Sequence, residues 1–260
     1  MYFSVIIPTY NSENYIRRAL ESLLKQTYKK FEVIVSDDGS SDNTKKILEN
    51  YREKFIKKEI FFKIIFNKHL GPGNARNKGL LESKYEWICF LDSDDEWFKD
   101  KLELVFREVL NMSSDYNCII HNEIYVNKNK KEINFTYTNM FDDRKPIFKQ
   151  LYNKNFLSPS SMCIKKKIIF ENNMFDLNLP NAQDYELWLK IGNSFKIKKL
   201  EKYLTKYFFR KNNISSRPYR ERVRFLIKIA NKHKTSTNSY FFIKKILQLL
   251  ISKEWIKELL

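Results

Sequence analysis

Phe3-Ser4-Val5-Ile6-Ile7-Pro8 is a short apolar run in which β-branched residues are followed by a proline. This pattern predicts a buried strand that ends at Pro8. A helix is expected next, after the start signal Asn11-Ser12. The apolar residues behind that signal share the spacing of one helical face: Ile16, Ala19, Leu20, Leu23 and Leu24. The chain therefore opens with a strand followed by an amphipathic helix.

The same strand-and-helix unit recurs through the first hundred residues. Further strands are predicted at Phe31–Ser36, Ile60–Phe66 and Trp87–Leu91. Helices are predicted around Ile47, Leu48 and Tyr51 and after the turn Gly71-Pro72-Gly73. Alternation at this spacing is typical of parallel strands with right-handed crossovers. We expect an α/β, Rossmann-type fold with a mostly parallel sheet that is flanked by helices.

The second half has a less regular pattern. It predicts helices at Lys101–Met112 and about Asp184–Ile191, and a strand at Tyr203–Arg210. A hairpin around Asn127–Lys131 is expected to join strands at Tyr116–Val126 and Ile133–Tyr137. Residues Ser216–Leu260 read as helical, which predicts a basic helical extension at residues 211–260.

Composition narrows the class of protein. The chain has 260 residues, 43% of them hydrophobic, which is enough for one large α/β domain. Its apolar runs are far shorter than the roughly 20 residues that span a bilayer, and the first residues lack a basic leader, so we expect a cytoplasmic protein. Cys89, Cys118 and Cys163 stand among apolar neighbours, and we interpret them as buried thiols.

The positive charge is concentrated near the C-terminus. From Lys196 onward the chain has 18 Lys and Arg against 4 Asp and Glu, out of a formal net charge of +17. Together with an apolar row from Phe242 to Leu260, this predicts an amphipathic helix that lies on an anionic membrane surface, with the protein peripheral to the inner face of the membrane. Packing of that helix on its own domain or a second subunit is the alternative, and a lysine-rich coding bias would also explain the charge.

Polar residues gather where the predicted strands end. Loops at the carboxyl ends of parallel strands share one edge of a sheet, where ligands bind. Asp92 and Asp94 stand two residues apart at such an end, and close carboxylates of this kind indicate a divalent metal, Mg²⁺ or Mn²⁺, with a diphosphate as co-ligand. The alternative is a helix cap formed by Asp95 or Ser93.

Two further loops add to this edge. Arg76 stands at the start of a helix that is entered through Gly71 and Gly73. It could bind phosphate through two parallel N–H donors of its guanidinium group. Asp37-Asp38-Gly39-Ser40 ends the second strand, although Asp-Gly-Ser is also ordinary turn chemistry. Each motif is weak by itself.

In combination these motifs resemble the family 2 glycosyltransferases, which have the GT-A fold. The resemblance rests on sequences with matching order and spacing: Val5-Ile6-Ile7-Pro8-Thr9-Tyr10-Asn11, Glu32 to Asp42, Gly73 to Gly79, Phe90-Leu91-Asp92-Ser93-Asp94-Asp95, and Asn181-Ala182-Gln183-Asp184-Tyr185-Glu186-Leu187-Trp188. It implies a catalytic domain at residues 1–210, with a nucleotide-sugar half at 1–100 and an acceptor half at 101–210.

The resemblance also implies roles for single residues. The implied donor site consists of Pro8, Thr9, Tyr10, Asp37, Asp38, Arg76, Asp92 and Ser93, with Asp37 or Asp38 reading a base, commonly uracil. Asp94 would bind the metal together with Asp92, and Asp184 would be the catalytic base. Transfer with inversion needs such a carboxylate opposite the leaving diphosphate. A cap on the helix Tyr185–Ile191 is the alternative for Asp184.

The chain departs from the family pattern in two places. Gln183 replaces a frequent glutamate before the base, and Asn212 stands where many members have a metal-reaching histidine. The Gln-x-x-Arg-Trp signature of processive synthases is absent, so we expect one sugar per acceptor, which would be a surface polysaccharide, lipooligosaccharide or lipid-linked precursor. The alternatives are a sugar nucleotidyltransferase and a basic nucleic-acid-binding protein, but an acidic strand-end cleft would repel nucleic acid, so no nucleic acid partner is expected.

Overall fold

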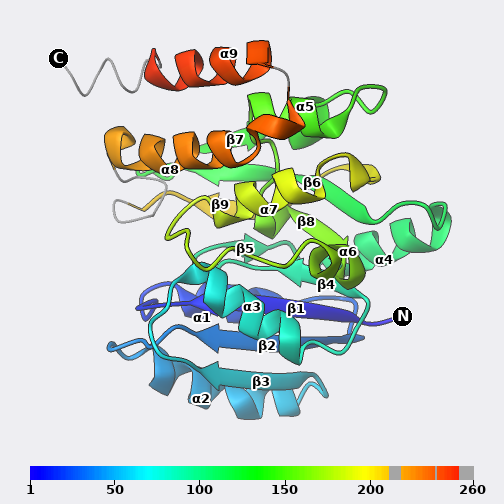
Figure 1. The fold of residues 1–260 in the computed structure, drawn as a ribbon. Coiled ribbons are helices and arrows are strands. Elements are labelled where there is room, and N and C mark those ends of the chain that lie inside the picture. The colour runs from blue at the N-terminus through cyan, green and yellow to red at the C-terminus, as the bar shows by residue number, and fades with distance from the viewer. Residues whose placement is uncertain (211–217, 238, 252–260) are drawn as a thin grey trace.

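The computed structural model describes residues 1–210, 218–237 and 239–251. Across these residues the core is a nine-stranded sheet in the order β3-β2-β1-β4-β8-β6-β9-β5, with β7 paired to β6. Helices lie against both faces of the sheet (Figure 1). Its strands are β1 Phe3–Thr9, β2 Phe31–Asp37, β3 Phe61–Phe66, β4 Trp87–Phe90, β5 Glu96–Trp97, β6 Cys118–Val126, β7 Glu132–Phe135, β8 Met162–Lys165 and β9 Ile197–Phe208.

The helices follow the predicted positions in the first half and add two short ones in the second. They are α1 Ile16–Leu24, α2 Thr44–Ile56, α3 Pro72–Glu82, α4 Lys101–Asn111, α5 Ile147–Asn153, α6 Lys166–Glu171, α7 Gln183–Ile191, α8 Tyr219–Lys232 and α9 Ser239–Leu250. The 3₁₀ turns η1 Tyr137–Asn139 and η2 Pro159–Ser161 lie beside β6 and β8.

The first four strands are parallel, as predicted. Every residue of β1 is buried, because helices cover both faces of the strand. Ile6 packs in one core with Leu80 of α3, whereas Val5 and Ile7 pack in a second core with residues of α1 and α2. Alternating residues of one short strand thus hold the two helical layers together.

The rest of the sheet is mixed. The strand β8 pairs antiparallel with both β4 and β6, and β6 pairs parallel with β9. The pairing is therefore uniformly parallel only in the first half of the sheet, because β8, which has four residues and no period of its own, enters antiparallel between β4 and β6. The predicted hairpin is confirmed, with β6 and β7 paired from Val126 and Glu132. All three cysteines are free and buried.

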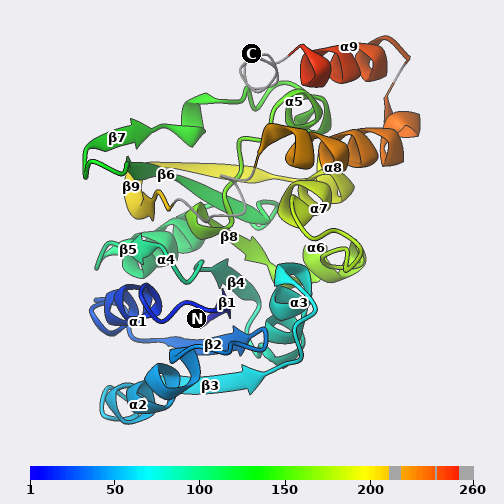
Figure 2. The same cartoon turned by 90° about the vertical axis from the view of Figure 1, so that its left-hand side faces the viewer.

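The C-terminal helices lie next to α5 and α7 at one end of the molecule (Figure 2). Ile229 and Ala230 of α8 belong to the same core as α7. The Nζ atom of Lys232 forms ion pairs with Oε1 of Glu186, at 2.7 Å, and with Oδ2 of Asp176, at 2.8 Å. The predicted helical segment is interrupted between α8 and α9, and its residues 216–217, 238 and 252–260 lie outside the described residues.

Candidate functional site

The carboxyl ends of β1, β2 and β4 meet at one edge of the sheet, as the sequence predicts. Thr9 at the end of β1 is in register with Asp37 at the end of β2. The Ser12 and Ser93 hydroxyl groups lie 2.9 Å apart and so join the loops that follow β1 and β4. Pro8 and Thr9 are buried within this junction. The loops that follow β1 and β4 are therefore joined by a buried polar contact.

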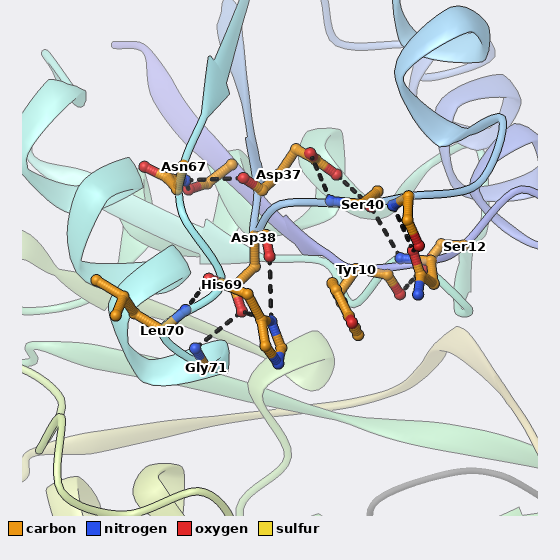
Figure 3. A network of polar contacts seen from close by, with 12 residues as sticks. Tyr10, Ser12, Asp37, Asp38, Ser40, Asn67, His69, Leu70 and Gly71 are labelled. Atoms are coloured by element: carbon orange, nitrogen blue, oxygen red, sulfur yellow. Dashed lines mark hydrogen bonds and ion pairs between the residues drawn. The ribbon is translucent and has the colours of Figure 1, made fainter.

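Asp38 fastens the loop before α3 to the end of β2 (Figure 3). Its buried carboxylate accepts hydrogen bonds from the amides of Leu70, at 3.0 Å, and Gly71, at 2.8 Å. The Nδ1 atom of His69 lies 2.8 Å from the same carboxylate. The exposed ring of Tyr10 stacks on His69, with the ring centres 4.1 Å apart. Asp38 thus fixes the loop that carries this aromatic pair.

Asp37 has a local structural role in the same region. Its carboxylate accepts hydrogen bonds from the backbone amide and the hydroxyl group of Ser40, and it is fully buried. The turn chemistry considered for Asp37-Asp38-Gly39-Ser40 is therefore present. Asp38 reaches the adjoining loop instead.

Arg76 and Asp92 form the centre of the site. The Nη2 atom of Arg76 donates to Oδ1 of Asp92 at 2.6 Å. Arg76 is buried, and within the described part of the chain its Nε and Nη1 atoms have no hydrogen-bond partner. A buried guanidinium group with unused donors is suited to bind an anion with a planar pair of oxygens.

Asp94 lies between two arginines that the sequence pattern did not assign to the site. Arg210, just after β9, pairs with its carboxylate, and Arg18 of α1 donates to its carbonyl oxygen at 2.6 Å. Burial raises the pKa of Asp94, although the charge of Arg210 opposes the shift. Arg18 escapes prediction because its place in an amphipathic helix is typical of a solvent-facing side chain, whereas Arg210 stands at the predicted end of a strand.

Neither helix-cap alternative holds. The residues after Asp92 lead into β5, and the next helix, α4, has Asp100 at its N-cap. Helix α7 begins at Gln183 with Ala182 at its N-cap and no side-chain capping bond, so Asp184 is inside the first turn. Burial raises the pKa of the Asp184 carboxyl group, while the nearby charge of Arg76 opposes the shift.

A buried polar layer that the sequence did not predict supports the Asp92 loop. The hydroxyl group of Ser160 accepts a hydrogen bond from the backbone amide of Asp92 at 3.1 Å. Behind it, Glu123 accepts hydrogen bonds from Ser158 at 2.8 Å and from Tyr137 at 2.9 Å. Burial raises the pKa of Glu123 to about 7. Nothing in the sequence distinguished Glu123 from the polar residues His121 and Asn122 that precede it in the same strand.

The carboxylates of Asp92 and Asp94 suit a metal ion whose remaining coordination positions are filled by other ligands. No group of three or more His, Cys, Asp or Glu residues among residues 1–210, 218–237 and 239–251 could hold an ion. Asp92 and Asp94 supply hard oxygen donors at one strand end, and Mg²⁺ is commonly bound by one or two carboxylates plus substrate phosphates. The two residues therefore fit a shared protein–substrate metal site. Asn212 lies outside the described residues.

Residues 4–172 match the family model "Glycosyl transferase family 2". The chain is 32% identical over 227 residues to the UDP-Glc:alpha-D-GlcNAc-diphosphoundecaprenol beta-1,3-glucosyltransferase WfgD of Escherichia coli, covering 84% of this chain and 81% of WfgD. It is 31% identical over 205 residues to an uncharacterized glycosyltransferase of Rickettsia felis, covering 78% of this chain. The chain spans only 32% of that Rickettsia protein's length.

A solved structure of S. aureus TarS, residues 1–349, has a similar fold. It superposes with a TM-score of 0.69 at 26% sequence identity, covering 97% of this chain and 72% of the TarS fragment. The same fragment in complex with UDP gives a TM-score of 0.65 at 26% identity, covering 96% of this chain and 71% of the fragment. The likeness extends over both halves of the sheet.

Proposed function

Because the chain belongs to glycosyl transferase family 2, we propose that it transfers one sugar from a UDP-sugar to a hydroxyl group of a glycan or lipid-linked acceptor, with inversion at the transferred carbon. The observation that carries this proposal is the hydrogen bond between Arg76 and Asp92 at the edge where β1, β2 and β4 end, with the charges of both residues acting on the carboxyl group of Asp184. Family membership favours this activity over nucleotide-sugar synthesis and over nucleic-acid binding.

The donor would lie across the ends of β1, β2 and β4. Tyr10 offers an exposed ring for the nucleobase, beside the loop that Asp38 holds. The complex of TarS with UDP supports uridine as the nucleoside. Pro8 and Thr9 would shape the floor of this subsite, with Asp37 behind it and Ser93 beside it.

Arg76 and the two aspartates would hold the diphosphate. The unused Nε and Nη1 donors of Arg76 are suited to oxygen atoms of the leaving group. Asp94 and Asp92 would hold Mn²⁺ or Mg²⁺, which would neutralise charge on the departing diphosphate. Arg210 already balances the charge of Asp94 and would have to share that carboxylate.

Asp184 would take the proton from the acceptor hydroxyl group. Its raised pKa makes its carboxylate a stronger base than an exposed aspartate. The acceptor oxygen would attack the sugar from the side opposite the diphosphate, so that one bond forms as the other breaks. No covalent sugar intermediate is needed, and one sugar is added per encounter.

A donor-binding and turnover assay tests this mechanism. A panel of nucleotide sugars is offered to the wild type, Asp94→Ala and Asp184→Asn with Mn²⁺, Mg²⁺ or EDTA, and both binding and hydrolysis are measured. We expect a UDP-sugar to bind only with metal, Asp94→Ala to lose binding, and Asp184→Asn to bind without turnover. Failure of every nucleotide sugar to bind the wild type would refute the proposed activity.

Contact with an anionic membrane through α9 belongs to the same proposal. No helix in the described ranges has the length and apolar character that a membrane span requires. The outer side of α9 exposes Tyr240, Ile243 and Leu247, with Lys244 among them. The E. coli relative's name describes a diphosphoundecaprenol-linked acceptor, and a peripheral position on the inner face of the membrane would bring such a lipid to the site.

Liposome flotation with anionic lipids tests this contact. The double variant Ile243→Gln, Leu247→Gln should float less than the wild type, because both exposed side chains lose their apolar contact. The control Ile56→Gln removes an apolar residue that is even more exposed, from α2 at the other end of the molecule. Equal flotation of all three proteins would contradict the proposed membrane contact.

A further inference from the structure

One face of the β7-β6-β9 ribbon carries a group of aromatic side chains, Tyr125, Phe135, Tyr137 and Tyr207, here called the aromatic face. Tyr125 of β6 is in register with Tyr207 of β9, and their rings stack with centres 5.7 Å apart. Glu123, two residues before Tyr125 and so on the same face of β6, is in register with Phe135 of β7. The rings of Phe135 and Tyr137 are 5.5 Å apart.

The aromatic face is open to solvent along β7. All four residues of β7 are exposed, and Phe135 keeps 41% of its surface accessible. Strand β7 extends along the side of the molecule, away from the core helices (Figure 2). The three tyrosines are half-buried. An exposed ring beside half-buried tyrosines combines apolar contact area with hydroxyl groups, which is typical of a binding surface.

The aromatic face is continuous with the candidate site. Tyr137 donates to Glu123 at 2.9 Å. Glu123 also accepts a hydrogen bond from Ser158 at 2.8 Å, two residues before Ser160, whose hydroxyl group accepts a hydrogen bond from the amide of Asp92 at 3.1 Å. Arg210, three residues after Tyr207, pairs with Asp94. A ligand that reached the catalytic carboxylates from this side would therefore pass over the rings.

Tyr137 also places the face on the catalytic side of the sheet. It packs against the core to which α7 contributes Tyr185, the residue next to Asp184. The nucleotide side, by contrast, is built from β1, β2 and the loop that Asp38 holds. The acceptor and the donor would thus approach the base from different parts of the sheet.

We propose that the aromatic face binds a pyranose ring of the acceptor, close to the sugar that is glycosylated. This inference rests on the proposed function and names its acceptor subsite. A pyranose ring has apolar C–H patches that pack on aromatic faces, and its hydroxyl groups can bond to phenolic oxygens. Tyrosine and phenylalanine supply such contact area at a small cost in side-chain entropy.

The test compares side chains of similar size with and without a ring. Phe135→Leu and Tyr125→Leu remove the ring but keep an apolar residue, and Phe135→Trp keeps a ring. Phe61→Leu is the control, because Phe61 is also an exposed strand residue, on β3 at the opposite edge of the sheet. The probes are p-nitrophenyl and decyl-diphosphate glycosides of glucose, N-acetylglucosamine, galactose and mannose.

Two readouts separate the acceptor subsite from the activity itself. For the glycoside that the wild type uses best, each leucine variant should raise the acceptor KM about tenfold, as loss of a stacked contact implies. Phe135→Trp and Phe61→Leu should remain near the wild-type value. Acceptor-independent hydrolysis of the UDP-sugar should be equal in all five proteins.

The outcomes distinguish the two proposals. A wild type that hydrolyses no nucleotide sugar contradicts the proposed function. A wild type that hydrolyses donor normally, while the leucine variants keep their acceptor KM, overturns the aromatic face alone. The aromatic face is also overturned if the wild type hydrolyses donor and neither uses nor binds any glycoside of the panel.

Discussion

The ammonium group of Lys101 donates a hydrogen bond to the carbonyl oxygen of Ser160 at 3.0 Å in the interior of the protein. That carbonyl also accepts hydrogen bonds from Trp97 at 3.1 Å and Thr205 at 3.0 Å, while the Ser160 hydroxyl group accepts the amide of Asp92. One residue of η2 thus joins α4, β5 and β9 to the loop that presents Asp92. Lys101 is a positioning residue behind the candidate metal site.

Replacement of Lys101 should change how stability depends on pH. Burial lowers the pKa of Lys101 from 10.5 to about 7. Between these values the unfolded chain binds more protons than the folded chain, so this group makes the wild type more stable as pH rises. Lys101→Met lacks this contribution, and the melting temperature of the variant minus that of the wild type should fall from pH 6 to pH 9. A difference in melting temperature that stays constant from pH 6 to pH 9 would contradict the lowered pKa of Lys101.

Replacement of Arg76 by lysine should weaken donor binding although the charge is kept. A guanidinium group can hold Asp92 and a phosphate together, whereas an ammonium group is a single point of charge. Loss of one charge-assisted contact, worth about 1.5–3 kcal/mol, predicts an increase in the Kd for UDP of about tenfold to a hundredfold. The control Arg52→Lys alters an exposed ion pair on α2 and should bind as the wild type does. Equal Kd values for the wild type and both variants would show that Arg76 does not contact the donor.

Replacement of Asp38 by alanine should destabilise the loop before α3. It leaves the part-buried amides of Leu70 and Gly71 without their acceptor, and a hydrogen bond to a charged group contributes about 1.5–3 kcal/mol. His69→Ala keeps both of these bonds and should unfold near the wild-type midpoint. Urea unfolding of the three proteins measures the difference. If Asp38→Ala and His69→Ala unfolded at the same urea concentration, the carboxylate of Asp38 would not be holding this loop.

The first half of the fold could be predicted because its strands are mostly apolar, because α1 and α2 have one apolar face, and because a glycine-proline turn precedes α3. β8 could not, because a four-residue strand inserted between distant neighbours has no period to detect. The carboxylates proposed for the donor site can be identified from the sequence because they follow predicted strands. Arg18 and Ser160 were missed, since only tertiary packing brings a helix-surface arginine and a loop serine to Asp94 and Asp92.

A methyl group at Gly79 should disturb both stability and donor binding. Helix α3 packs directly on β1 here, and a Cβ at Gly79 would lie 2.4 Å from Cγ2 of the fully buried Ile6. Overpacking of this kind costs about 1–3 kcal/mol, more than the roughly 1 kcal/mol that alanine gains in a helix. Because Arg76 lies one turn earlier on the same helix, a shift of α3 would also move its guanidinium group away from Asp92.

Gly79→Ala should therefore lower the midpoint of urea unfolding and raise the Kd for UDP, whereas Lys78→Ala, an exposed neighbour on α3, should change neither. Ile6→Leu removes the β-branch that carries Cγ2, so the double variant Gly79→Ala, Ile6→Leu should lose less stability than the sum of the single changes. Additive losses would show that the two residues do not meet. A stability loss with an unchanged Kd would show that Arg76 keeps its place when α3 moves.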